Sequence, residues 1–130
     1  MKKFYILAVG MALVVLTGCK STIPVPQYVD QPVAQYGEST STTKDIERSI
    51  VRAAASLGWK TKVKSEGKIL ATLDIRKHQL VVLIKHDDKN LTVEYQSSLN
   101  LKYDGKKIHR QYANWVTNLL RAIDVQNVTK

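Results

Sequence analysis

The chain has 130 residues and a formal net charge of +9, from 20 basic and 11 acidic side chains. This length suffices for one domain. The single cysteine, Cys19, excludes an internal disulfide.

The first 18 residues have the pattern of a secretory signal peptide. Lys2 and Lys3 form a basic start, and an apolar run follows from Phe4 to Leu16. The run is too short for a membrane-spanning helix, which needs about 20 apolar residues. The ending Leu16-Thr17-Gly18-Cys19 resembles the bacterial lipobox, in which the chain is cut before the cysteine and lipid is attached to the cysteine.

The resemblance to a lipobox implies a lipoprotein signal peptide at residues 1–18 and a mature protein that starts at lipidated Cys19. Stable anchoring needs more than one acyl chain, and a triacylated cysteine carrying palmitate-type chains meets that need. Lys20 follows the cysteine, and a residue other than Asp at this place resembles the pattern sorted to the outer membrane. We therefore expect a periplasm-facing protein anchored in the cell outer membrane. The alternative is an ordinary cleaved signal peptide with a stray thiol.

Residues 19–42 have no helical or strand period and hold all three prolines, Pro24, Pro26 and Pro32. This composition is typical of a flexible Pro/Ser/Thr tether, so we expect the region to be dispensable for folding. Alternatively, its proline segments dock into a groove on a partner. The tether has a net charge of −1, and residues 43–130 have +8, from 17 basic and 9 acidic side chains.

Residues 43–130 predict a single small α+β domain with the order α-β-β-β-β-α. Thr42 and Asp45 fit a capping box, and an apolar stripe follows that predicts a helix from Thr43 to about Leu57. Alternating apolar residues predict strands at about 59–65, 69–76 and 91–96. The continuous apolar run Leu80–Ile84 predicts a fourth strand, which is either covered on both faces or has an outer face open to a partner. Short turns between them favour a four-stranded antiparallel meander. A second amphipathic helix is expected over about 109–125, with both helices packed on one face of the sheet.

A block around the start of the second helix resembles an uncharacterised family of small proteobacterial lipoproteins. The matching residues are Asn100-Leu101-Lys102-Tyr103-Asp104-Gly105, Ile108-His109, Tyr112, Trp115-Val116 and Asn118-Leu119. The likeness covers about residues 43 to 125. It implies a location and a fold, and it implies no reaction.

The sequence offers no constellation typical of a metal, cofactor or catalytic site. The three histidines, His78, His86 and His109, have neither the spacing nor the companions of metal ligands. No serine has a predictable histidine partner, and no pair of acids is placed for cleavage of a sugar bond. We therefore expect no cofactor and no enzyme activity.

Two groups of side chains are candidates for binding. Lys60, Lys62 and Lys64 form one face of a strand, which is either a solvated edge or an electrostatic platform reinforced by Lys106, Lys107 and Arg110. The second group mixes aromatic and amide side chains around one turn, and comprises Asn100, Tyr103, His109, Tyr112, Asn114 and Trp115. Such a group binds sugar or peptide, or it locks the turn onto the helix, with Tyr112 and Trp115 in the core.

The basic domain of an exported protein meets anionic lipid headgroups, cell-wall polymers or acidic proteins rather than nucleic acid. The leading hypothesis is a non-catalytic, membrane-anchored periplasmic lipoprotein that binds an envelope component or a partner protein. One alternative is a hydrolase or an inhibitor acting on cell-wall polymer. Another is a structural accessory subunit of an envelope assembly complex.

Overall fold

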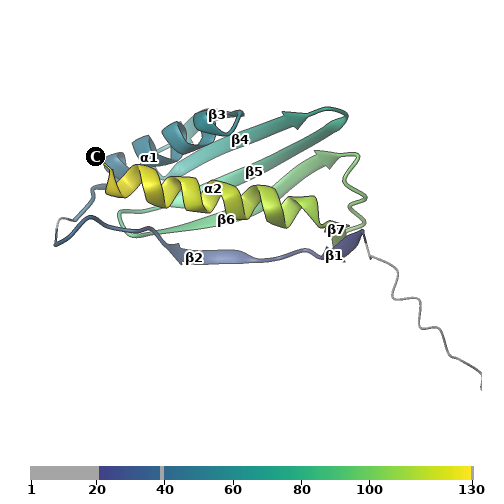
Figure 1. Cartoon of the computed structure of the whole chain (residues 1–130), viewed down its shortest axis with the longest axis horizontal. Coiled ribbons are helices and arrows are strands. Elements are labelled where there is room, and N and C mark those ends of the chain that lie inside the picture. The colour runs from purple at the N-terminus through teal and green to yellow at the C-terminus, as the bar shows by residue number, and fades with distance from the viewer. Residues whose placement is uncertain (1–20, 39, 130) are drawn as a thin grey trace, which may run out of the picture.

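The computed structural model describes residues 21–38 and 40–129, so the expected signal peptide and Cys19 lie outside the described residues. The two helices are α1 (Thr43–Ser56) and α2 (Gln111–Val128). The strands in chain order are β1 (Thr22–Pro24), β2 (Tyr28–Pro32), β3 (Trp59–Ser65), β4 (Lys68–Ile75), β5 (His78–His86), β6 (Asn90–Leu99) and β7 (Lys107–His109). Figure 1 shows their arrangement.

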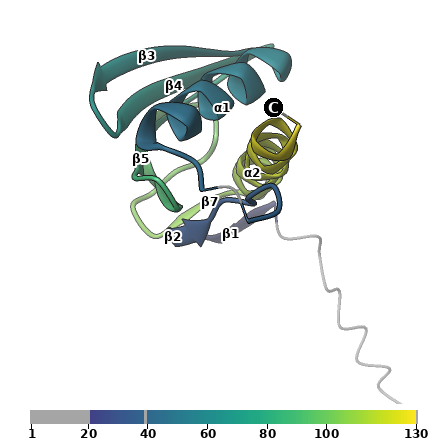
Figure 2. The ribbon, with the colours of Figure 1, turned by 90° about the vertical axis from the view of Figure 1, so that its left-hand side faces the viewer.

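The main sheet is antiparallel, has five strands and has the order β2-β6-β5-β4-β3. The predicted meander is present as β3 to β6, and the α+β class is confirmed. The fifth strand, β2, and a small second sheet of β1 with β7 were not predicted. Figure 2 shows the sheet curving around α1 and α2, which lie together on its concave face, as predicted.

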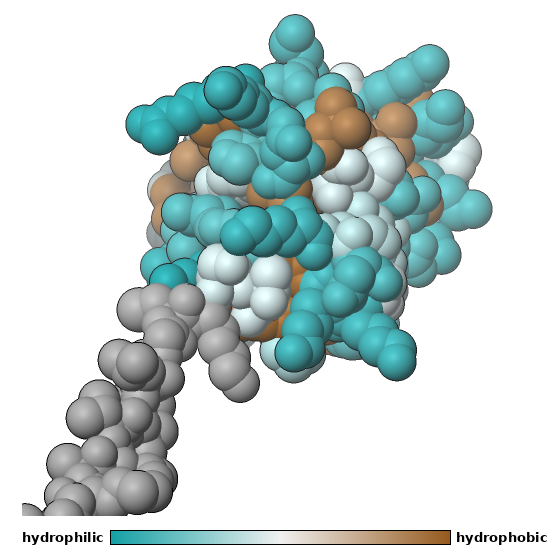
Figure 3. All heavy atoms as spheres, turned by 90° about the vertical axis from the view of Figure 1, so that its right-hand side faces the viewer, coloured by the Kyte–Doolittle hydropathy of each residue, from teal (hydrophilic) through white to brown (hydrophobic). Residues whose placement is uncertain are grey.

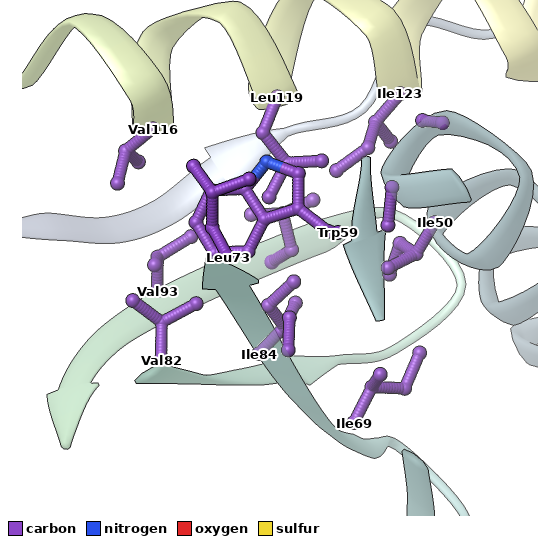
Figure 4. Close-up of a cluster of buried hydrophobic side chains, with 14 of the residues drawn as sticks. Ile50, Trp59, Ile69, Leu73, Val82, Ile84, Val93, Val116, Leu119 and Ile123 are labelled. Carbon is purple, nitrogen blue, oxygen red and sulfur yellow. The ribbon is translucent and has the colours of Figure 1, made fainter. Parts of the chain in front are cut away.

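The core lies between this concave face and the two helices. Alternate residues of the central strands are fully buried, among them Ile69 and Ala71 of β4 and Val82 and Ile84 of β5. Figure 4 shows such side chains meeting residues of the helices, including Leu119. Each large apolar side chain that is buried in this way stabilises the fold by about 1.5–3 kcal/mol. The period of two in the strands and of 3.6 in the helices directs these residues to one core.

The start of α1 follows its sequence signals closely. The Thr42 amide donates to Oδ2 of Asp45 at 2.9 Å, and the Asp45 amide donates to Oγ1 of Thr42 at 3.1 Å. These two bonds confirm the predicted capping box and satisfy two amides that the helix leaves without partners. Gly58 follows the helix with a φ of +86°, the left-handed conformation that commonly ends a helix.

The expected tether is wrong for residues 22–33, which belong to the fold. β1 pairs with β7, and β2 pairs with β6 at the edge of the main sheet. Val33 is 4% exposed, and Val25 and Tyr28 pack against the core. The strand pattern is hidden because the β2–β6 register shifts between Tyr28 and Gln31. This bulge breaks the alternation by which a strand is recognised. The prolines fit because Pro24 and Pro32 stand at strand ends and β2 is an edge strand.

A buried polar cluster ties the segment after β2 to both helices. Asn127 of α2 is fully buried, and its Nδ2 donates to the Ala34 carbonyl at 2.6 Å. Its Oδ1 accepts from the Ser49 hydroxyl of α1 at 3.0 Å and from the Ser41 hydroxyl at 3.3 Å. The Ala34 amide in turn donates to Oδ1 of Asp124 at 2.9 Å. The sequence pattern predicts an end of the second helix at about Val125, so this cluster at Asn127 was not predicted.

Candidate binding sites

A pocket lined by tyrosines is the strongest candidate site. Its volume is about 320 Å³, and its lining residues are Val25, Pro26, Gln27, Val93, Glu94, Tyr95, Tyr103, Gly105 and Tyr112. These residues come from the β1–β2 connection, from β6, from the loop before β7 and from α2. The volume is at the lower end of the range of small-molecule sites, which are mostly apolar with a few polar groups. We call it the tyrosine pocket.

Three of the tyrosines pack on one another in this pocket. The ring centroids of Tyr95 and Tyr103 are 4.1 Å apart, with 33° between the ring planes. Tyr95 also meets Tyr112 edge to face, with centroids 6.2 Å apart. The hydroxyl of Tyr95 bonds to the hydroxyl of Ser98 at 2.7 Å. Tyr103 is partly exposed, so one rigid aromatic surface faces solvent.

The hydroxyl of Tyr112 makes this pocket chemically distinct. The residue is 1% exposed and lines the pocket. Within the described part of the chain its hydroxyl has no hydrogen-bond partner. Burial, together with the neighbouring Tyr28, Tyr95 and Tyr103, raises the pKa of Tyr112 to about 12, so the group stays a neutral donor and acceptor. The hydroxyl is not among the buried polar atoms left without a partner, so it is open to the pocket and a ligand atom there could bond to it.

The loop that carries Tyr103 is held by its backbone. Oδ1 of Asp104 accepts from the amides of Lys106 at 2.9 Å and Lys107 at 2.7 Å. These two bonds hold the pKa of Asp104 below its usual value, and the bond from the Lys107 amide has the larger effect. Gly105 has a φ of +93°, which favours glycine in this tight turn. The Val25 amide donates to the Lys106 carbonyl at 3.1 Å and joins the loop to β1.

The predicted aromatic and amide group does not gather at one site. Tyr103 and Tyr112 meet in the tyrosine pocket. Asn100 instead holds a turn, because its Nδ2 donates to the Lys77 carbonyl at 2.5 Å and its carbonyl bonds Nδ1 of His78 at 2.8 Å. Asn114 is exposed and donates to Oε1 of Gln111 at 3.0 Å. Tyr95 was not predicted as part of a site, because no local sequence signal indicates its contact with Tyr103.

His109 lies with His78 and Trp115, outside the tyrosine pocket. The centroid of the His78 ring is 6.5 Å from that of His109 and 6.1 Å from that of Trp115. Nδ1 of His109 accepts from the Gln111 amide at 3.1 Å and caps the start of α2. Burial is the main cause that lowers the pKa of His109. The positive charge of Lys102 is the next largest cause. The imidazole therefore stays neutral and keeps its capping bond, which fits a structural role.

The two basic groups that were predicted to form one platform are separate. Lys60 and Lys62 pair with Thr72 and Leu70 on the outer face of the main sheet, where β3 is one edge. Lys106 and Lys107 lie at β7, which pairs with β1 beyond the other edge. Figures 1 and 2 both show β3 and β7 on opposite sides of the molecule. The two groups therefore do not form one platform.

A second hollow, of about 370 Å³, lies between α1 and β3. Its lining is mainly polar and charged, with Lys44 and Glu47 bonded to each other at 2.9 Å and Lys64, Ser65 and Glu66 exposed. It has no aromatic side chain. The tyrosine pocket is therefore the better candidate, although it is slightly smaller.

Among residues 21–38 and 40–129, no three histidine, cysteine, aspartate or glutamate side chains gather as a metal site would require. None of the helices in this described part combines the length and the apolar character needed to cross a membrane. Comparison with known proteins finds no matching family model, no matching curated protein and no matching solved structure.

Proposed function

We propose that this protein is a lipid-anchored, non-catalytic module of the cell envelope. In this proposal Cys19 carries the lipid that holds the protein in the outer membrane, and the domain faces the periplasm. The domain binds a sugar-bearing envelope component in the tyrosine pocket. The observation that carries the binding proposal is the Tyr112 hydroxyl, which lines the pocket without a hydrogen-bond partner among the described residues, beside the closely packed rings of Tyr95 and Tyr103.

The chemistry of the pocket suits a sugar ring. A sugar has apolar C–H faces that pack on aromatic rings, and hydroxyls that need donors and acceptors. The rings of Tyr95 and Tyr103 offer an aromatic surface for the C–H faces. Hydrogen-bonding groups for the sugar hydroxyls come from Gln27, Glu94 and the Tyr112 hydroxyl. A volume of about 320 Å³ is enough for a small fragment of a glycan.

Binding is favoured over hydrolysis of a sugar bond. Hydrolysis needs two carboxyl groups on either side of the bond, about 5–9.5 Å apart. Glu94 is the single carboxylate among the residues that line the tyrosine pocket, and its Oε1 is bonded to Nζ of Lys85 at 2.8 Å. This pairing supports a neutralised contact group rather than a general acid.

Substitutions in the pocket are expected to weaken glycan binding while the fold survives. Tyr112→Phe removes only the unpartnered hydroxyl, so stability should hardly change, and loss of one hydrogen bond should weaken binding up to about tenfold. Tyr103→Ala removes an exposed ring and should weaken binding by at least about tenfold. Titration with soluble peptidoglycan fragments and lipopolysaccharide core oligosaccharide, followed by tyrosine fluorescence or NMR, measures both effects.

Tyr36→Ala is the matched control, because Tyr36 is exposed and does not line the pocket. It should bind as the unaltered protein does. If no glycan fragment shifts the signals of Tyr95, Tyr103 or Tyr112, the sugar-binding proposal is wrong. Saturable shifts with a proline-rich peptide instead would assign the pocket to a protein partner.

Lipidation is expected to depend entirely on Cys19, the only cysteine. Cys19→Ser should leave a larger, unprocessed precursor that takes up no lipid, because neither the thiol nor the cleavage pattern remains. Metabolic labelling with a fatty-acid analogue, followed by gel electrophoresis, measures both. Ser21→Ala serves as the control and should be processed normally. Label on the Cys19→Ser protein would contradict the anchor.

A further inference from the structure

The point at which the chain joins the fold is fixed at one end of the domain. The Arg110 amide donates to the Ser21 carbonyl at 3.0 Å, and Nζ of Lys102 donates to Oγ of Ser21 at 3.1 Å. Thr22 then opens β1, opposite His109 of β7. Figure 1 places β1 and β7 together at this end, where α2 also begins. No tether therefore stands between Ser21 and the domain.

The covalent distance from Ser21 to the proposed lipid is very short. Two residues of extended chain reach about 7 Å from Cys19 to Ser21. The screening length in physiological salt is about 8 Å. With Cys19 at the level of the lipid headgroups, side chains beside Ser21 lie within about one screening length of them. The charges at this end of the domain therefore act directly on the bilayer surface.

Those charges are predominantly positive. Six exposed basic side chains come from the β4–β5 turn, the loop before β7, β7 itself and the start of α2, and they are Arg76, Lys77, Lys102, Lys106, Lys107 and Arg110. We call this set the basic end. The bond from Asn100 to the Lys77 carbonyl brings the β4–β5 turn to the later loop. Figure 3 looks onto this side and shows hydrophilic side chains over much of it.

Few acidic side chains offset this charge. Asp104 lies in the loop before β7, and Asp74 stands near the end of β4. Glu94 lines the tyrosine pocket beside the same loop and is paired with Lys85. Oδ1 of Asp104 is already engaged by the amides of Lys106 and Lys107, and Oδ1 of Asp74 accepts from Nε2 of Gln79 at 2.9 Å. The basic end thus keeps a net positive charge toward the side from which the anchor arrives.

We infer that the basic end docks on anionic phospholipid headgroups of the membrane that holds the anchor, and so fixes the orientation of the domain. This inference rests on the proposed lipidation of Cys19. Each basic residue near an anionic surface adds to the attraction, and several together outweigh thermal reorientation. The acyl chains supply the anchorage, and the basic end supplies the orientation.

Docking fixes the distance of the other parts of the molecule from the bilayer surface. α2 begins at Gln111, next to the basic end, and its 18 residues extend about 27 Å to Val128. Tyr103 and Gly105 of the tyrosine pocket belong to the same loop as Lys102 and Lys106. The pocket therefore borders the bilayer, which suits a sugar-bearing component that is itself held in the membrane.

Two single-cysteine variants of the mature lipidated protein test the docking. Lipidation consumes the thiol of Cys19, the only cysteine, so an introduced cysteine can be labelled alone. Gln111→Cys puts a fluorophore at the start of α2, and Val125→Cys puts one about 21 Å farther along the helix, at a side chain that is 57% exposed. The protein is reconstituted in phosphatidylcholine vesicles with or without phosphatidylglycerol. Quenching by headgroup nitroxide lipids is then measured.

The expected result is that quenching at position 111 exceeds quenching at position 125, that phosphatidylglycerol increases this difference, and that added salt reduces the increase. The triple variant Lys102→Gln, Lys106→Gln, Lys107→Gln should lower the docking equilibrium constant roughly a hundredfold. The matched control, Lys60→Gln, Lys62→Gln, Lys64→Gln, removes the same charge from β3 and should keep the quenching pattern. Unchanged melting of both triple variants shows that the fold is intact.

Equal quenching at both positions, or equal loss in both triple variants, would overturn the docking inference while leaving the anchor in place. The mass of the purified protein reports the anchor separately. A protein without acyl chains on Cys19 would overturn the proposed lipidation, and with it the docking that rests on it.

Discussion

Removal of residues 21–40 is expected to unfold the domain. A chain that begins at Ser41 loses β2 from the edge of the main sheet and leaves β7 without β1. It also loses the buried Val33 and the ring of Tyr28, whose centroid is 6.2 Å from that of Tyr112. On the α2 side, Nδ2 of Asn127 and Oδ1 of Asp124 lose their bonds to Ala34. Unsatisfied buried polar groups cost about 1–3 kcal/mol each.

The summed loss is of the same order as the whole stability of a small domain, about 5–15 kcal/mol. Thermal melting by circular dichroism should therefore show a cooperative transition for the mature chain and none, or one far lower, for the chain beginning at Ser41. A melting temperature unchanged by the deletion would contradict this prediction and would show that the segment is a tether.

A pair of point variants isolates the packing part of this effect. Val33 is 4% exposed and Val29 is 56% exposed, although both belong to the same segment. Val33→Ala should destabilise the domain by about 1–2 kcal/mol, since two methyl groups leave the core. Val29→Ala should change the free energy of unfolding by less than about 0.5 kcal/mol.

Trp59→Ala is expected to destabilise the domain more than Trp115→Ala. Trp59 is buried in β3 opposite Leu73, and Figure 4 shows its ring among core side chains. Truncation of a buried aromatic residue costs about 3–5 kcal/mol. Trp115 was expected in the core and is only partly buried, at the side of α2 where it meets His78. Its truncation should cost about half as much, because less apolar surface returns to water.

Urea unfolding of the two variants measures the difference directly. The two midpoints should differ clearly while the slopes of the transitions stay alike, since both variants keep the same fold. Phe in place of each tryptophan is a milder control and should preserve the order of the two effects. A larger loss for Trp115→Ala would contradict the burial described for these rings.

Only some residues of the tyrosine pocket could be predicted from local sequence patterns. Tyr103 and Tyr112 could be singled out because they stand close together in the sequence around one turn. Tyr95 and the Val25–Gln27 segment could not, because only strand pairing and the bond between Val25 and Lys106 bring them there. Likewise, Lys60 and Lys106 looked equivalent in the sequence, and the sheet order separates them.

The features that could be predicted from the sequence are those that depend on neighbours along the chain. The capping box at Thr42, the meander of β3 to β6 and the core face of each element follow from hydrogen bonds and periodicities within a few residues. The role of residues 22–33 could not be predicted, because β2 pairs with a strand about sixty positions later and a bulge hides its alternation. The same holds for the buried Asn127 and for the basic end. Their partners come from distant segments, and contact between distant segments is set by the packing of the whole core.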